Sequence, residues 1–235
     1  MVLRQKPTAP VGALLPAIQQ RLLLEAALEL VKSSSSSSSS LQQLKAILPP
    51  LDKDSLQRGT QQDVRVLQRY DPAQLLRGDL VRASMNLYTT NLNYNNLVYN
   101  NNNNGVNENA TPYTVTDPSW KKSYIRANNG LPDLQQVIGA DLDLRYLYRN
   151  RVELLLLDAA AELYSDSNTK DGYDDASVVD NTEELQQLLQ EAANAFDQWL
   201  DRVRYGDVRD ALQAAMKGQT TKVYDSWAAG FLPPR

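Results

Sequence analysis

Residues 133–163 read DLQQVIGADLDLRYLYRNRVELLLLDAAAEL and carry the clearest structural signal in the chain. Apolar side chains recur every three or four residues along this stretch, a spacing that places them on one face of an α-helix. Two oppositely charged pairs, Asp141 with Arg145 and Arg149 with Glu153, are four residues apart. Each pair would stabilise a helix surface by about 0.2–0.5 kcal/mol. The stretch therefore predicts one helix of about thirty residues.

A second amphipathic helix is predicted from about residue 182 to residue 204. Its apolar face consists of Leu185, Leu188, Leu189, Ala192, Phe196, Trp199, Leu200 and Val203. Asn181 with Glu184, or Asp180 with Glu183, would form a capping box at its start. Gly206 interrupts the pattern, and a short helix capped by Asp207 is predicted to end near residue 217.

The first half of the chain contains shorter helical patterns, at residues 17–32, 41–48 and 60–92. The last of these is interrupted at Asp71-Pro72, where Pro72 is expected to begin a new helix. Gly78 weakens that helix by about 1 kcal/mol relative to alanine, which indicates close packing against a neighbour. No segment alternates convincingly over the length of a strand. We therefore predict an all-α fold, an antiparallel four-helix bundle with extra short helices and low-complexity loops.

Three segments fall outside this helical pattern. Residues 1–16 contain three prolines and are expected to form an extended arm, since proline removes a hydrogen-bond donor and disfavours helix before it. The serine-rich tract 33–40 and the asparagine-rich tract 91–109 are expected to be flexible inserts. The remainder, residues 17–235, is interpreted as a single helical domain.

Composition excludes several classes of function. The 235-residue chain has no cysteine and no histidine, and its 24 basic and 28 acidic residues give a net charge of −4. Disulfides, thiolate metal sites, cysteine nucleophiles and the commonest general base are thereby absent. We expect a non-enzymatic protein with no cofactor and no small-molecule substrate. The acidic balance argues against a nucleic-acid partner, and no apolar run reaches the about 20 residues that a transmembrane helix requires.

The acidic stretch from residue 166 to residue 184 departs from the pattern of a calcium-binding loop. Position five counted from Asp166 is Lys170, Gly172 is one place late, and position twelve is Ser177 rather than glutamate. The stretch is therefore interpreted as a solvated acidic loop, and no metal site is expected.

A segment that mixes aromatic and basic side chains is the best candidate for docking on a partner. It contains Trp120, Lys121, Lys122, Tyr124 and Arg126. Aromatic residues and arginine are enriched at protein interfaces, and a net acidic chain needs a local basic patch to bind an acidic surface. The alternative is that this segment enters the following helix and packs its Trp and Tyr on the bundle.

The same segment carries a family resemblance. Trp120 followed by Tyr124-Ile125-Arg126, then Leu134, Val137-Ile138 and Leu156 with Asp158-Ala159-Ala160, resembles the PsbQ-type extrinsic (oxygen-evolving enhancer) subunits of photosystem II. The proline-bearing N-terminal segment is similar to theirs, and the serine and asparagine inserts suit an algal relative. The resemblance covers about residues 117–164.

The resemblance implies a four-helix bundle that binds peripherally to photosystem II subunits in the chloroplast thylakoid lumen. There it would stabilise the oxygen-evolving complex without ligating its metals. A soluble helical adaptor or scaffold protein outside the photosynthetic membrane is the alternative, using the same basic-aromatic segment.

Overall fold

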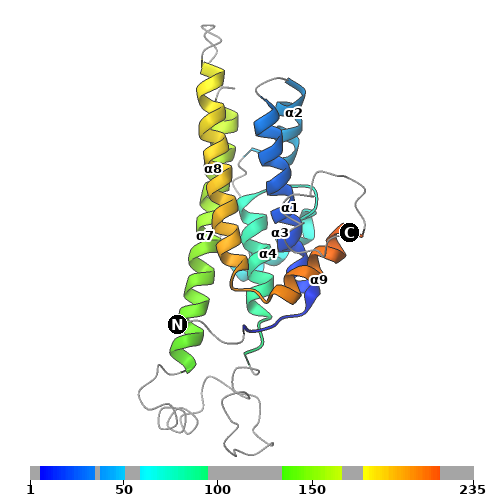
Figure 1. Ribbon diagram of the computed structural model, residues 1–235, viewed down its shortest axis with the longest axis vertical. Coiled ribbons are helices and arrows are strands. Elements are labelled where there is room, and N and C mark those ends of the chain that lie inside the picture. The colour runs from blue at the N-terminus through cyan, green and yellow to red at the C-terminus, as the bar shows by residue number, and fades with distance from the viewer. Residues whose placement is uncertain (1–5, 35–37, 51–58, 95–133, 166–176, 218–235) are drawn as a thin grey trace, which may run out of the picture.

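The computed structural model describes residues 6–34, 38–50, 59–94, 134–165 and 177–217 (Figure 1). These ranges contain seven helices: α1 (Val11–Ser34), α2 (Ser38–Ile47), α3 (Thr60–Arg69), α4 (Gly78–Thr90), α7 (Leu134–Ser165), α8 (Ser177–Leu200) and α9 (Tyr205–Met216). They contain no β-strand, and their one isolated β-bridge joins Thr8 to Asn93. The predicted all-α class is confirmed.

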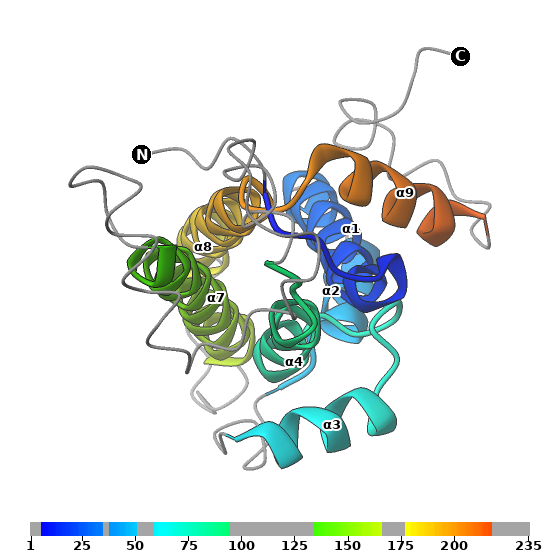
Figure 2. The same cartoon turned by 90° about the horizontal axis from the view of Figure 1, so that it is seen from below.

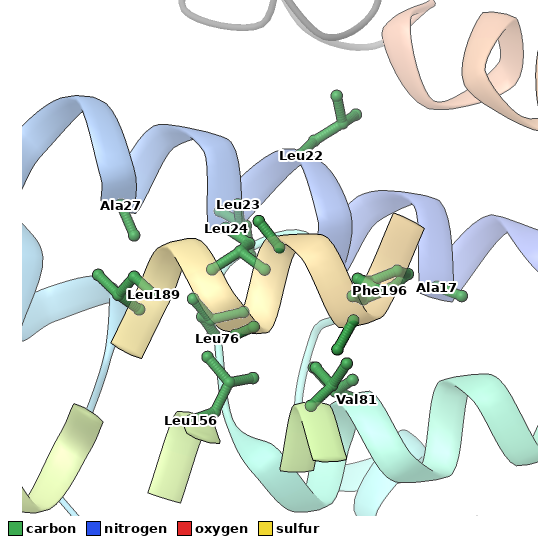
Figure 3. Packing of buried hydrophobic residues seen from close by; sticks show 14 of the residues in the cluster. Ala17, Leu22, Leu23, Leu24, Ala27, Leu76, Val81, Leu156, Leu189 and Phe196 are labelled. Carbon is green, nitrogen blue, oxygen red and sulfur yellow. The ribbon is translucent and has the colours of Figure 1, made fainter. Parts of the chain in front are cut away.

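One hydrophobic core is shared by helices from both halves of the chain. Helix α7 lies along α8, and α1 contacts α2, α4, α8 and α9 (Figures 1 and 2). Ala17, Leu24, Val81, Leu156 and Phe196 are among the side chains that meet in this core (Figure 3). Because these residues come from four helices, the core connects the two halves of the chain.

Three aromatic rings pack together in the core. Trp199 of α8 is fully buried, and its ring lies 5.6 Å from that of Tyr88 and 6.2 Å from that of Phe196, both in edge-on geometry. Edge-to-face pairs of this kind stabilise a core by about 0.5–1.5 kcal/mol beyond the burial of their area. The apolar face predicted for α8 is therefore confirmed as its core face.

The predicted arm over residues 1–16 is too long. Helix α1 begins at Val11, so Pro16 lies inside a helix rather than in an extended segment. Leu14 and Ile18 flank this proline and are fully buried in the core. Burying a leucine or isoleucine stabilises the fold by about 1.5–3 kcal/mol, which offsets the hydrogen bond that Pro16 cannot donate.

The serine-rich tract was expected to be a flexible insert, but both of its ends are helical. Ser33 belongs to α1, and its hydroxyl donates to the carbonyl of Leu30 at 2.9 Å. Residues 38–40 form the first turn of α2, while residues 35–37 lie outside the described part of the chain. The ends of the tract therefore extend the flanking helices, and the Ser33 hydroxyl is satisfied there by the carbonyl three residues earlier. Of the asparagine-rich tract only residues 91–94 are described, and Asn93 bridges to Thr8.

Helix α1 bears on the expectation that no segment spans a membrane, which stays a prediction. Over Val11–Ser33 it is long and apolar enough to do so by length and composition. Gln20 and Arg21 interrupt its apolar run, but they leave the mean hydropathy of an 18-residue window at 1.2. The fold buries 67 % of that window, as a core helix would, and both polar side chains have partners in the fold.

The chain is interrupted between α3 and α4, as predicted, but the second helix begins later than expected. Pro72 lies in a turn in which the Asp71 carboxylate accepts a hydrogen bond from the main-chain N–H of Ala73 at 2.9 Å. Helix α4 begins only at Gly78. The N–H of Leu76 donates to the carbonyl of Ile47 at 2.8 Å, which ties this connection to the end of α2.

Helices α4 and α7 run antiparallel in close contact. A Cβ atom on Gly78 would lie 2.8 Å from the main-chain oxygen of Glu153, closer than real Cβ contacts. One turn further along α4, Arg82 donates to the Glu153 carboxylate at 2.6 Å, and one turn after that Asn86 accepts from Arg149. The prediction that Gly78 permits close packing is therefore confirmed.

We predict that Gly78→Ala lowers the free energy of unfolding by about 1–3 kcal/mol, because the added methyl group forces α4 away from α7. Gly139→Ala is the matched control, since Gly139 lies in α7 with nothing within 4 Å of its added Cβ. It should be neutral or stabilising by up to about 1 kcal/mol. Urea unfolding followed by circular dichroism measures both. Equal stability of the two variants would contradict the close approach at Gly78.

Candidate functional site

The docking residues predicted from the sequence, Trp120, Lys121, Lys122, Tyr124 and Arg126, lie outside the described residues. Their role as a docking patch stays a prediction. Most of the acidic stretch that was compared with a calcium loop, residues 166–176, also lies outside them, while Ser177 begins α8. Within the described ranges, no group of three or more acidic residues could hold a metal ion.

The described part of the chain contains a groove lined by α3, α4 and α7, which we call the α3/α4/α7 groove. Its volume is about 340 Å³. Helix α3 lies at the periphery beside α4, and α7 also packs against α4 (Figure 2). The lining residues are Gly59, Thr60, Asp63, Val64, Leu67, Arg82, Ala83, Asn86, Leu87, Thr90, Tyr146 and Arg149. Within each helix, helical spacing places these lining residues on one face.

A buried arginine connects the three helices at the groove. Arg82 of α4 is 3 % exposed, and it donates to Asp63 of α3 at 3.2 Å and to Glu153 of α7 at 2.6 Å. The second oxygen of Asp63 accepts from the Asn86 amide at 2.7 Å. Buried charges are stable only when they are paired and hydrogen-bonded, so Arg82 requires both carboxylates.

A second arginine, Arg149, also lines the groove, and its hydrogen bonds go to neutral acceptors. Its guanidinium donates to the amide oxygens of Asn86 and Asn150, and it lies over the Tyr146 ring at 4.7 Å from the ring centre. Among the described residues, no carboxylate lies within ion-pairing distance of it. Burial lowers the pKa of Arg149, and the nearby carboxylate of Glu153 opposes this shift. The guanidinium is thus partly desolvated without a direct counter-ion.

The two charge pairs predicted within α7 have different outcomes. Arg145 donates to Asp141 at 2.8 Å, which confirms the first pair, but Arg145 is fully buried rather than at the surface. The second pair is wrong: Glu153 pairs with Arg82, and Arg149 bonds to asparagine amides. Spacing within one helix cannot show that a residue of another helix competes for the same carboxylate.

A second polar cluster lies deeper in the fold, around Arg145. Besides Asp141, this guanidinium donates to the main-chain oxygen of Arg202, and Tyr94 donates to Asp141 at 3.3 Å. Burial raises the pKa of Tyr94, and the Asp141 carboxylate raises it further. Four buried groups in this part of the fold have no hydrogen-bond partner in the described structure: Arg145 Nη1, Tyr88 Oη, Trp199 Nε1 and Asp207 Oδ2.

Comparison with known proteins found no match to a family model, to a curated protein or to a solved structure. The class of protein is therefore defined by the described fold and its groove: an all-α protein with an apolar, arginine-bearing groove between α3, α4 and α7.

We predict that Arg82→Met lowers the free energy of unfolding by about 3–5 kcal/mol, because it leaves Glu153 and Asp63 without their buried counter-ion. Arg151→Met is the matched control on α7. Arg151 is 57 % exposed and pairs with Glu191 at 3.5 Å, so its loss should cost less than about 1 kcal/mol. Chemical denaturation measures both variants, and a loss at Arg82 no larger than that at Arg151 would rule out the buried triad.

Two tyrosine substitutions should have opposite effects on stability. Tyr88→Phe removes a buried hydroxyl that has no partner, so it should be neutral or raise the free energy of unfolding by up to about 1–3 kcal/mol. Tyr94→Phe removes the bond to Asp141 and should lower it by about 0.5–1.5 kcal/mol. Thermal unfolding of the two variants tests this. A loss of 1 kcal/mol or more in Tyr88→Phe would mean that its hydroxyl has a partner.

Proposed function

We propose that this protein is a non-enzymatic extrinsic subunit of photosystem II, bound peripherally at the lumenal face of the thylakoid membrane, where it stabilises the oxygen-evolving complex. One observation carries the proposal: the resemblance of residues 117–164 to PsbQ-type subunits. Part of that stretch is described as α7. There Leu156, Ala159 and Ala160 are buried and Asp158 is exposed, so the shared motif falls on a core-facing helix.

We further propose that α1, α4, α7 and α8 form the antiparallel four-helix bundle of this family, with α2, α3 and α9 as the extra short helices. The helix contacts support this arrangement. Helix α7 contacts α8, α8 contacts α1, α1 contacts α4, and α4 contacts α7, so the four contacts form a closed ring. Of the short helices, α3 packs beside α4 outside that ring, while α2 and α9 add buried residues such as Leu44 and Leu212 to the shared core.

The ion pairing of the carboxylates around Arg82 supports a binding role rather than a catalytic one. Asp63, which lines the groove, and Glu153 of α7 are both held by Arg82 in ion pairs. A general acid or base needs a group that can exchange its proton near the operating pH, and histidine is absent from the whole chain. These carboxylates serve to connect helices.

Docking is proposed to use the basic-aromatic segment of Trp120, Lys121, Lys122, Tyr124 and Arg126. Attraction between exposed charges weakens as salt shortens the screening length, from about 10 Å at 0.1 M to about 3 Å at 1 M. High salt should therefore release the protein from isolated algal thylakoid membranes without detergent. The soluble-adaptor alternative predicts no association with these membranes at any salt concentration.

We predict that the triple variant Lys121→Glu, Lys122→Glu, Arg126→Glu loses rebinding to salt-washed thylakoid membranes while keeping its helical circular dichroism spectrum, because charge reversal repels an acidic docking surface. The matched control reverses three exposed basic residues elsewhere, Lys32, Arg151 and Arg209. Immunoblots of membrane pellets measure rebinding. If the triple variant rebinds like the wild type, the docking surface lies elsewhere. If the wild type itself does not bind, the photosystem proposal fails and the adaptor alternative is favoured.

A further inference from the structure

The rim of the α3/α4/α7 groove exposes apolar surface. Val64 of α3 is 51 % exposed, and Tyr146 of α7, on the other wall, is 38 % exposed. Leu67 and Leu87 continue this surface into the groove. Apolar side chains that surround a concavity form a binding surface, whereas single exposed apolar residues are ordinary.

The groove also offers a positive charge. Asp63, which lines the groove, and Glu153, which does not, are both bonded to Arg82, and neither lies within ion-pairing distance of Arg149. Arg149 is held in place by Asn86, Asn150 and the Tyr146 ring, and its guanidinium is therefore positioned in advance. Pre-positioned donors bind a ligand with less loss of conformational entropy.

We infer that the α3/α4/α7 groove binds a segment of a partner protein that presents a carboxylate side chain beside an apolar one. The carboxylate would meet Arg149, whose planar guanidinium matches its two oxygens. The apolar side chain would cover Val64 and Leu87. Charge complementarity selects an acidic rather than a basic or neutral segment.

The rim favours a protein segment over a free small acid. Tyrosine and arginine are the residue types that dominate binding energy at protein interfaces, and Tyr146 and Arg149 are adjacent here. The exposed apolar residues Val64 and Tyr146 also lie on opposite walls of the rim. A small acid bonded to Arg149 would leave them uncovered, while a peptide segment can cover both. The inference is independent of whether the partner belongs to photosystem II.

The test uses the purified full chain and two peptides that differ in one group, acetyl-Leu-Asp-Leu-amide and acetyl-Leu-Asn-Leu-amide. Titration into ¹⁵N-labelled protein should shift amide signals around Val64, Leu87 and Tyr146. The aspartate peptide should bind about tenfold more tightly than the asparagine peptide, since a charge-assisted hydrogen bond is lost in the latter. The free acid 4-methylpentanoate, titrated in parallel, should bind more weakly than the aspartate peptide.

Three variants assign the preference to the groove. Arg149→Gln should reduce the preference for aspartate to within about twofold. Val64→Glu places a negative charge on the exposed rim without disturbing the core, and should weaken binding of the aspartate peptide selectively. Arg151→Gln removes an exposed arginine that does not line the groove, and should leave the preference unchanged. Circular dichroism checks that each variant is folded.

Several outcomes would overturn the inference: equal affinity for the two peptides, shifts confined to other surfaces, or no shifts at all. A preference for aspartate that survives in both Arg149→Gln and Val64→Glu would place the site elsewhere. Binding of 4-methylpentanoate as tight as that of the aspartate peptide would mean that the groove takes small acids rather than a protein segment.

Discussion

The contact between α4 and α7 at Glu153 is the constraint on which the rest of the structure depends. The main-chain oxygen of this residue lies where only a glycine, Gly78, fits on α4, and its carboxylate accepts from Arg82 one turn later. Together these contacts set both the distance and the register of the two helices. One turn further along α4, the same antiparallel register pairs Asn86 with Arg149. Since α7 also packs along α8, and α4 packs against α1, an error in this register would be transmitted to the whole core.

The α3/α4/α7 groove follows from that register. Arg82 reaches Glu153 on one side and Asp63 on the other, so α3 is attached to α4 through a buried charge. Both carboxylates are then committed to Arg82, and Arg149 is left facing the groove with amide partners. The carboxylates that join the helices are thus also charges near Arg149, and the binding proposed for the groove would depend on the same group of side chains. A buried pair of this kind contributes geometry more than net stability.

Sequence reasoning succeeded where local periodicity decides the structure and failed where distant segments compete. The three- to four-residue spacing around Phe196 and the isolated Gly78 were sufficient to predict a core face and a close helix contact, and both are confirmed. Pro16 suggested an extended arm, but burial of its neighbours Leu14 and Ile18 outweighs the local preference. The groove was not predictable, because residues near positions 63, 82 and 149 meet only through tertiary packing. No periodic pattern in one helix reveals the charge that another helix brings to it.

The most direct test of this account is a double-mutant cycle between Arg82 and Glu153, using Arg82→Met, Glu153→Leu and the double variant in urea unfolding. The account predicts a coupling energy of about 2 kcal/mol or more, because removing both charges avoids the penalty of leaving either one buried alone. The exposed pair of Arg151 and Glu191 provides the reference cycle, with an expected coupling below about 0.5 kcal/mol. A coupling between Arg82 and Glu153 no larger than that of the reference pair would contradict the claim that this contact sets the register of the fold.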